Sequence, residues 1–431
     1  MTSISEDTAS KRGWFNFNLL WSGQTLSLLG SQFVVIGMPL LAVQVAGATP
    51  SQAVLLPFLM YLPFLLIGLP AGALVDRMNK RRLMVLCDAV QCAIYISIFA
   101  MTLTQTLTIH ILMAMMFFTG CANVFFQVSY TSLLPNIFRE NELLQKGNSR
   151  LCFSESMVNI VGPFLAGPLI SLFGIAVSVL INAASFFVSL VTLSCISFGT
   201  HASEHSAGER EVRKNVFHAV YTDVIQGIRF VFHHDYLQPI YLCGALYVLF
   251  LTAIDTSLVL YCKDVLGLPA YQIGIVVGAA AAGFPLANLL SSYVVTKLGF
   301  SRTLVTGATI SVIGLLFIPV AGNYHLVSGI VIASIIHGFG EGIFNPVAMT
   351  FRQKESPANM IGRVNAVHRF LIWGAISLGS LMNSFVIHTW GLEAALWAGG
   401  AGTLTCLVPL LRRGIRKDIF QRECEVKNEF H

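Results

Sequence analysis

The chain has 431 residues, of which 55% are hydrophobic and only 11% are charged. Soluble domains carry about 25% charged residues, so this composition excludes a water-soluble enzyme of several domains, and it also excludes a disordered or collagen-like chain. The formal net charge of +5 could suggest a nucleic-acid partner, but the positions of the basic residues along the chain, given below, argue against that interpretation.

Twelve apolar stretches are long enough to cross a bilayer as helices, which takes about 20 mostly apolar residues. In chain order they are residues 18–46, 53–75, 82–103, 108–134, 149–173, 175–198, 237–262, 270–296, 303–321, 325–350, 364–388 and 392–411. The first stretch is too long for the apolar region of a cleavable signal peptide. The sequence therefore predicts an all-α integral membrane protein with twelve transmembrane helices.

The Lys and Arg residues indicate how these spans are oriented. Of the 26 basic residues, all except Lys263 fall in the loops and termini on the same side of the membrane as the N-terminus. Basic loops resist translocation, so we expect both termini to be cytoplasmic. This distribution explains the positive net charge without a nucleic-acid partner.

The longest hydrophilic stretch, residues 199–236, divides the spans into two sets of six. Its second part carries apolar residues at helical spacing, which is typical of an amphipathic helix at a membrane surface. A weak internal repeat pairs VDRMNKRRLMV (75–85) with VTKLGFSRTLV (295–305). We therefore expect a bundle at 1–198, a cytoplasmic linker at 199–236, a second bundle at 237–411 and a basic cytoplasmic tail at 412–431.

Four segments carry a resemblance to a known family. The loop GALVDRMNKRR (72–82) is similar to the signature loop of the major facilitator superfamily, G-x-L-x-D-R followed by a basic cluster. Three others resemble segments of that superfamily's bacterial efflux branch, which contains macrolide exporters and the enterobactin exporter: NIVGPFLAGPLISLFG (159–174), DVIQGIRFVFHH (223–234) and FRQKESPANMIGRVNAV (351–367). The resemblance implies two pseudo-symmetric six-helix bundles in a bacterial inner (plasma) membrane, working by alternating access.

The resemblance also implies a gate at the signature loop. The candidate gate residues are Gly72, Asp76, Arg77, Arg81, Arg82 and Arg363. In relatives the aspartate latches the gate, and Asp76 could also cap the third span or pair with arginines. The equivalent position of the second half is Thr296, so we expect an aspartate latch only in the first half.

Four acidic residues fall inside predicted spans, where an ionisable group costs at least about 2.5 kcal/mol on insertion scales and usually serves a cavity or a partner. They are Asp88, Glu155, Asp255 and Glu341. Asp88 lies within two turns of a basic loop, so we expect it to be a partner of the gate or loop. Glu155 and Asp255 could bind a proton, a cation or a substrate amine, or could form buried salt bridges, for instance to Arg150 or Arg369.

One face of the tenth span is the most informative candidate for proton coupling. His337, Glu341 and Asn345 recur at four-residue steps and therefore share a helix face. A histidine beside a glutamate in a low dielectric can hold a shared proton. The alternative is a hydrogen-bonded polar pair that fixes helix packing. The proton-coupling candidates are thus Glu341, His337, Asp255 and Glu155.

Polar and aromatic side chains within the spans could line a substrate cavity. The candidates are Gln24, Ser31, Asn123, Gln127, Asn159, Thr252, Asn345 and Trp373. Neutral polar groups would orient a substrate by hydrogen bonds, and an aromatic ring would supply an apolar wall. The alternative for Trp373 is a position in the packed core or against lipid.

No nucleotide-binding, hydrolase or zinc motif is present, so we expect no enzyme activity, catalytic residue, metal or cofactor. The leading hypothesis is a secondary transporter that exports a small amphipathic molecule, such as a siderophore, a macrolide-like drug or a secreted metabolite, by proton antiport. The alternatives are a proton-coupled importer of a nutrient or iron chelate and, from another class, a non-transporting receptor. The expected partners are the small-molecule substrate, protons and the lipid bilayer, and the chain is expected to be a monomer.

Overall fold

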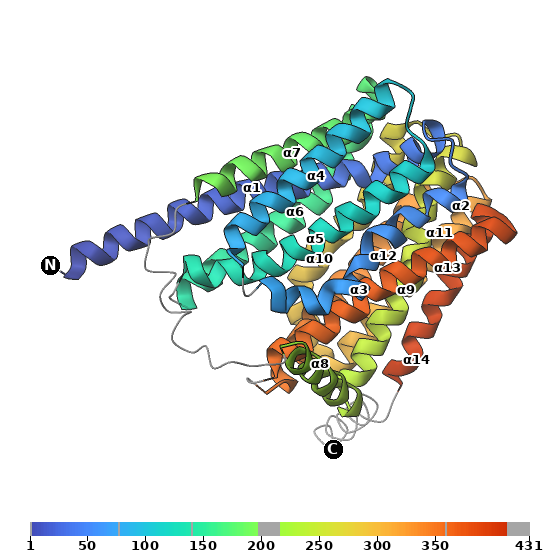
Figure 1. Ribbon diagram of the computed structural model, residues 1–431. Coiled ribbons are helices and arrows are strands. Elements are labelled where there is room, and N and C mark those ends of the chain that lie inside the picture. The colour runs from blue at the N-terminus through green and yellow to red at the C-terminus, as the bar shows by residue number, and fades with distance from the viewer. Residues whose placement is uncertain (1, 76–77, 139–140, 197–215, 358–359, 412–431) are drawn as a thin grey trace, which may run out of the picture. The chain divides into compact units, whose positions relative to one another are not determined.

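The computed structural model describes residues 2–75, 78–138, 141–196, 216–357 and 360–411, and the regular elements within them are helices (Figure 1). In chain order these are α1 (Thr2–Gln44), α2 (Pro50–Ala53), α3 (Leu55–Val75), α4 (Lys80–Leu103), α5 (Ile109–Ile137), α6 (Asn141–Phe173), α7 (Ala176–Cys195), α8 (Val216–His233), α9 (Leu237–Asp264), α10 (Ala270–Leu298), α11 (Phe300–Asn323), α12 (Val327–Glu355), α13 (Ile361–Thr403), η2 (Leu404–Cys406) and α14 (Leu407–Leu410). The first part of the predicted linker and the predicted basic tail lie outside the described residues.

Eleven stretches of the described chain are long and apolar enough to cross a membrane, and the last of them is divided in two. It runs over 49 residues from Gly362 to Leu410, about twice what a bilayer requires. Gly391 interrupts it with φ 87° and ψ 179°, a conformation that is essentially restricted to glycine. The chain turns there, which separates the predicted spans 364–388 and 392–411 and confirms the expected twelve.

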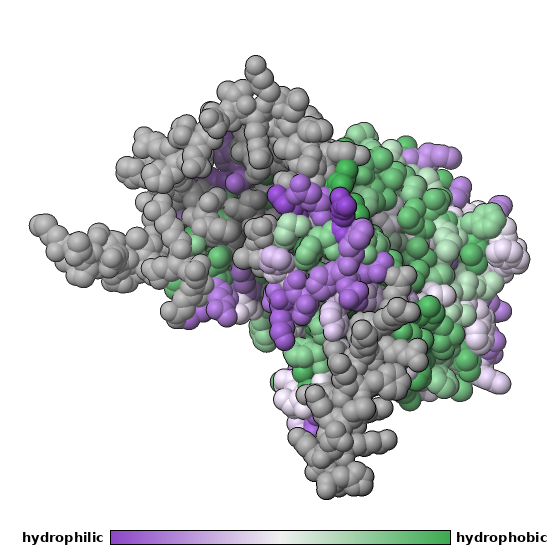
Figure 2. Space-filling view, turned by 90° about the horizontal axis from the view of Figure 1, so that it is seen from below, coloured by the Kyte–Doolittle hydropathy of each residue, from purple (hydrophilic) through white to green (hydrophobic). Residues whose placement is uncertain are grey.

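Large apolar side chains cover the outside of these helices. Leu289 is 78% exposed and Leu172 is 76% exposed, which would be unfavourable in water and is expected where lipid replaces it. In the space-filling view the flank at the right is mostly hydrophobic, while hydrophilic residues gather on the face turned toward the viewer (Figure 2). The chain is therefore an integral membrane protein.

The chain forms two compact units. The described residues of 1–47 and 63–221 make the first unit, in which α1 packs on α6 and α7, and α4 packs on α5 and α7. The described residues of 48–62 and 222–431 make the second, in which α12 packs on both α10 and α11, and α13 packs on α9. The stretch 48–62 thus belongs to the second unit although it precedes the linker by more than 100 residues.

The predicted second span, 53–75, is interrupted near its start by a side chain from α13. After a capping box at Thr49 has started α2, the hydroxyl of Ser380 accepts from the backbone N–H of Phe58 at 3.1 Å and donates to the carbonyl of Val54. The hydroxyl stands where a regular helix would join these two backbone groups directly. Such an insertion breaks a helix, and it separates α2 from α3.

Two more serines on α13 extend this contact. Ser384 donates to the carbonyl of Ser51 at 2.7 Å, and Ser377 donates to the carbonyl of Phe58 at 3.3 Å. Ser377 is fully buried and Ser384 is buried. Within the second unit, hydroxyl-to-carbonyl hydrogen bonds therefore tie residues 48–62 to α13.

Candidate functional site

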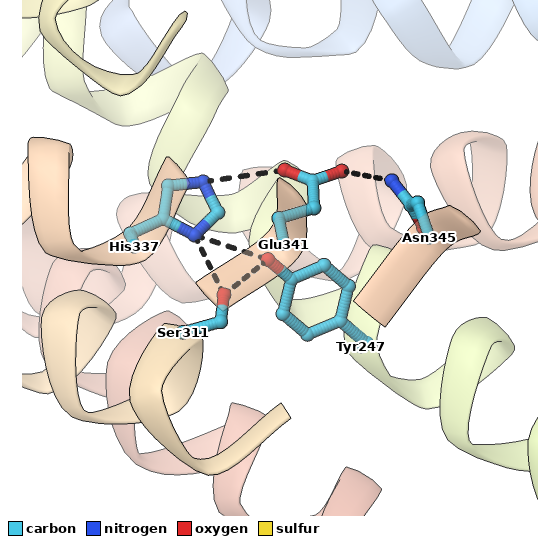
Figure 3. A network of polar contacts seen from close by, with 5 residues as sticks. All are labelled: Tyr247, Ser311, His337, Glu341 and Asn345. Carbon is cyan, nitrogen blue, oxygen red and sulfur yellow. Dashed lines mark hydrogen bonds and ion pairs between the residues drawn. The ribbon is translucent and has the colours of Figure 1, made fainter. Parts of the chain in front are cut away.

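Three polar side chains meet on one face of α12 (Figure 3). Nε2 of His337 lies 3.8 Å from Oε2 of Glu341, and Nδ2 of Asn345 donates to Oε1 of Glu341 at 3.1 Å. The side chain of His337 is 7% exposed and that of Glu341 is 28% exposed. The carboxyl group of Glu341 is thus half-buried, between a buried imidazole and an exposed amide.

Two residues from neighbouring helices complete the network on the other side of the imidazole. The hydroxyl oxygens of Tyr247 (α9) and Ser311 (α11) lie 3.0 Å and 2.9 Å from Nδ1 of His337, and 2.7 Å from each other. Neither residue is recognisable from the sequence as part of this site. They lie 90 and 26 residues away along the chain, and nothing in the sequence distinguishes them from the other polar residues of α9 and α11.

Glycines bring α12 close enough to its neighbours for these contacts. A Cβ on Gly340 would collide with the backbone nitrogen of Ser311 in α11, and a Cβ on Gly338 would collide with the carbonyl of Ala280 in α10. Small residues allow this close approach between membrane helices. The position of Ser311 beside His337 therefore depends on the missing side chain at residue 340.

Each group in this network can change its role in a hydrogen bond. A hydroxyl donates or accepts, an imidazole carries its proton on either nitrogen, and a carboxyl group gains or loses one. A charge at membrane depth costs free energy, and the amide of Asn345 offsets part of that cost by donating to Glu341. The arrangement is suited to holding a proton between His337 and Glu341, and equally able to fix the packing of three helices.

Asp255 lies on α9, eight residues beyond Tyr247 and so about 12 Å along the helix axis, and its side chain is exposed. The sequence places Thr252 and Val259 on the same face, but they are only 6% and 1% exposed. The hydroxyl of Thr252 donates to the carbonyl of Val248 at 2.7 Å. The helix face that carries these three residues spans about 100° of the surface of α9. One part of this face packs against neighbouring helices and the other does not, so the three side chains differ in exposure.

In the first unit, Glu155 and Asn159 are both exposed on α6. The side-chain oxygen of Asn159 accepts from Nε2 of Gln32 on α1 at 2.8 Å. Arg150, which the sequence offers as an ion-pair partner for Glu155, instead lies over the ring of Trp14, 4.8 Å from its centroid. Among the described residues no ion pair joins Arg150 to Glu155, so this carboxylate stays on the surface of the first unit.

The other predicted cavity residues are distributed over both units. Gln24 is 8% exposed, and its Oε1 makes no hydrogen bond within the described chain. The hydroxyl of Ser31 donates to the carbonyl of Ser27 at 3.0 Å. The remaining three are half-buried: Asn123, Gln127 and Trp373. Their contact with a substrate stays a prediction.

The predicted gate residues lie in several different surroundings. Asp76 and Arg77 fall outside the described residues, and Gly72 lies in α3. Arg81 donates from Nε to the carbonyl of Leu193 at 2.9 Å and from Nη2 to the carbonyl of Ser194. It therefore satisfies carbonyls of the last turn of α7, where a cation is also favoured by the helix dipole.

The structure corrects the expected cap of the third span. Oδ1 of Asn79 accepts from the backbone N–H of Arg82 at 3.1 Å, and α4 begins at Lys80. An N-cap is the residue directly before the first helical residue, so Asn79 holds this position. Asp76 comes three residues too early to cap α4.

Arg363 connects α13 to the surface helix α8. Its Nη1 donates to Oε1 of Gln226 at 2.8 Å. Close by, a Cβ on Gly227 would lie 3.1 Å from the carbonyl oxygen of Arg363, so the two helices are in contact through a glycine. Arg363, the predicted gate residue in the second unit, is thus hydrogen-bonded to α8, the helix of the predicted linker.

Asp88 is placed differently from what its sequence position suggests. It is fully buried on α4, and neither carboxyl oxygen makes a hydrogen bond within the described residues. Gln91 and Tyr95 on the same helix are also buried, at 3% and 2% exposed. The expected pairing with the basic loop is therefore absent from the described chain, because the helix turns Asp88 inward toward the packed interior of the first unit.

The described residues also bear on metal binding. Within them, no group of three or more His, Cys, Asp or Glu side chains is arranged to hold a metal ion. The eight cysteines that the structure describes are all free thiols.

Comparison with known proteins identifies relatives over most of the chain. The family model for the Major Facilitator Superfamily matches residues 20–380 and 240–422. The chain is 20% identical to Macrolide efflux protein A of Streptococcus pyogenes, over 92% of this chain and 94% of that protein. It is 23% identical to Multidrug efflux pump Tap of Mycolicibacterium fortuitum (86% and 88% covered), and 24% identical to the uncharacterized MFS-type transporter YfiS of Bacillus subtilis (88% and 87% covered).

Solved structures share the fold at low sequence identity. A bacterial homologue of the iron transporter ferroportin in an inward-facing state matches with a TM-score of 0.67 and 17% identity, over 92% of this chain and 98% of that chain. The nucleoside transporter NupG matches with a TM-score of 0.71 and 10% identity, over 92% and 98%. At these identities the likeness establishes the fold alone.

Proposed function

We propose a specific transport activity for this chain, which belongs to the Major Facilitator Superfamily. As a member it is a membrane transporter of small molecules and not an enzyme, and this argues against the receptor alternative. The resemblance of its loop and helix segments to the bacterial efflux branch agrees with its full-length relatives. Beyond this, the proposed activity is export of a small amphipathic molecule in exchange for protons.

The proposed direction rests on relatives that match nearly the whole chain. Two of them are named for efflux, one of macrolides and one of several drugs. The proposal places the chain in a bacterial plasma membrane with both termini in the cytoplasm, which the one-sided distribution of Lys and Arg supports. A macrolide-like amphipathic molecule is therefore the first substrate class to test.

The observation that carries the proposed proton coupling is the close approach of the half-buried Glu341 to the buried imidazole of His337. A proton on Glu341 removes a charge whose burial in the membrane is costly. The free energy of enclosing or opening this face of α12 then differs between the two protonation states. A ligand shifts a conformational equilibrium only through such a difference, so Glu341 is the group expected to link proton binding to the transport cycle.

The test uses purified protein in proteoliposomes, with radiolabelled erythromycin as the probe. With an imposed pH gradient the wild type should transport the probe, and the rate of this gradient-driven transport should be at least 10-fold lower for Glu341→Gln. The same variant should retain exchange of labelled for unlabelled probe without a gradient, because exchange needs a folded transporter but no proton. Glu355→Gln, on the same helix, is the matched control and should behave as wild type.

Two results would count against the proposal. Undiminished gradient-driven transport by Glu341→Gln would remove Glu341 as the coupling group. Failure to transport erythromycin or any member of a panel of amphipathic drugs would remove the proposed substrate class. Cells that accumulate a compound only when the chain is present would instead favour the importer of a nutrient or iron chelate.

A further inference from the structure

We propose that Tyr247 and Ser311 are positioning residues that hold the neutral ring of His337 with its proton on Nε2, facing Glu341. The consequence for transport rests on the proposed coupling role of Glu341, whereas the tautomer itself can be measured without transport. The same hydrogen bonds provide a route by which a proton would reach the carboxyl group.

The two hydroxyls and Nδ1 of His337 form a closed triangle, with sides of 2.7, 2.9 and 3.0 Å. If Nδ1 carries a lone pair, both hydroxyl hydrogens find an acceptor: Tyr247 donates to Ser311, and Ser311 donates to Nδ1. If Nδ1 carries a hydrogen, three hydrogens share the same three atoms and one hydroxyl has no acceptor left in the triangle. Ser311 is 1% exposed, so water does not replace the missing acceptor, and a buried unpaired donor is unfavourable.

The other side of the ring favours the same tautomer. Oε1 of Glu341 already accepts from Asn345, while Oε2 faces Nε2 of His337 across 3.8 Å. A hydrogen on Nε2 directs a donor toward this carboxylate, whereas a lone pair there would repel it. The distance exceeds that of a hydrogen bond, so transfer between the two groups requires Glu341 to move closer.

A proton can then pass across the ring with its balance complete. It enters at the hydroxyl of Tyr247, which is half-buried; Tyr247 passes its own hydrogen to Ser311, Ser311 passes its own to Nδ1, and the hydrogen on Nε2 passes to Oε2 of Glu341. The ring ends as the Nδ1–H tautomer, the carboxyl group is neutral, and the network has gained one proton. Each hydroxyl keeps one hydrogen and the bonds of the triangle reverse, so that Ser311 accepts from Nδ1 and Tyr247 accepts from Ser311. Residues of α9 and α11 therefore change their hydrogen bonds when a residue of α12 is protonated.

Few other groups can interfere with this exchange. Among the residues that the structure describes, the titratable side chains in contact with His337 are Tyr247 from α9 and Glu341 from α12 itself. From α10 and α11 the close contacts of α12 come from residues such as Ala280 and Gly307, which do not titrate. On α9, Asp255 lies about 12 Å along the helix axis from Tyr247 and is exposed.

The test reads the tautomer directly by ¹⁵N NMR of histidine-labelled protein in micelles. The signals of His337 among the 11 histidines are assigned by their loss in His337→Gln. We expect a protonated Nε2 and an unprotonated Nδ1 in the wild type, and a mixture of tautomers when Tyr247→Phe and Ser311→Ala are combined. Thr309→Ala is the matched control, because that hydroxyl bonds only within α11, to the carbonyl of Val305 at 2.8 Å.

The same variants have a second readout in proteoliposomes with erythromycin. In the double variant the rate of transport driven by the pH gradient should be at least 10-fold lower than in wild type, while exchange without a gradient should be retained. Ser311→Thr, which retains the hydroxyl, should have the tautomer and the transport rate of wild type. A wild-type ring protonated on Nδ1, or an unchanged tautomer in the double variant, would overturn the proposal. If the double variant does not fold, the tautomers of wild type and Ser311→Thr still test the proposal, which requires a protonated Nε2 in both.

The two proposals fail separately. If the tautomer is as expected but Glu341→Gln transports normally, the coupling role of Glu341 is lost and the positioning of His337 stands. If Glu341→Gln is uncoupled but the ring is protonated on Nδ1, coupling stands and the positioning proposal is wrong.

Discussion

The close approach of α12 to α11 predicts a large effect from one added methyl group. In Gly340→Ala the new Cβ would collide with the backbone nitrogen of Ser311 and lie 2.6 Å from the carbonyl oxygen of Gly307. A Cβ essentially never comes within 3.0 Å of a heavy atom on another helix. Since both neighbours are backbone atoms, no side chain can rotate away, and α11 itself must withdraw from α12.

The expected loss of stability combines two effects of this withdrawal. Overpacking of a well-packed interface costs about 1–3 kcal/mol. The withdrawal also stretches the 2.9 Å contact between Ser311 and His337, and an interhelical hydrogen bond in a membrane contributes about 0.6 kcal/mol. At about 2–4 °C per kcal/mol, a scale taken from soluble domains, the apparent Tm should fall by several degrees.

The assay follows tryptophan fluorescence of purified protein in micelles during heating at a fixed scan rate, because unfolding of such proteins is often irreversible. The matched control is Gly244→Ala on α9 in the same unit, where the nearest atom to a Cβ is the flexible Cδ1 of Ile372 at 3.7 Å. This control should keep the wild-type Tm. A Tm of Gly340→Ala equal to that of wild type, or an equal loss in the control, would refute the packing argument.

Two other substitutions test the second unit by the same assay. Asn383 is 1% exposed, and its Nδ2 lies 2.8 Å from the hydroxyls of both Thr256 and Ser257. Asn383→Ala should therefore lower the free energy of unfolding by about 1–2 kcal/mol and lower the Tm. An unchanged Tm would show that these hydrogen bonds do not contribute to stability. Gly391→Ala places a side chain on a residue with φ 87° and should lower the free energy of unfolding by about 1–3 kcal/mol. The control is Gly362→Ala, which has open space around its Cβ and should keep the wild-type Tm. An equal fall in Tm for both variants would contradict the explanation from the backbone conformation.

Hydropathy and charge predicted the fold because a bilayer permits few solutions. Helices satisfy their own backbone hydrogen bonds, and their length is set by the membrane, so the spans could be counted from the sequence. The division at Gly391 was predictable as a gap between two apolar runs. The break between α2 and α3 was not, since the hydroxyl that causes it belongs to Ser380, 322 residues further along the chain.

The candidate site was predictable only where one helix supplies it. The spacing of His337, Glu341 and Asn345 places them on one face of α12 without any knowledge of packing. Tyr247 and Ser311 come from two other helices, and no periodicity tells which faces of α9 and α11 turn toward α12. The inward position of Asp88 was missed for the same reason, because distance along the helix from a basic loop does not give direction around it.

The insertion of Ser380 between Phe58 and Val54 has a consequence for how the protein is made. At about 5–20 residues per second, the ribosome takes about 15–60 s to add the 322 residues that separate Phe58 from Ser380. During that time the N–H of Phe58 and the carbonyl of Val54 must find other partners, and within a nascent helix the nearest are each other. The newly inserted segment would then be a regular helix, which opens to its final shape only when α13 has entered the membrane.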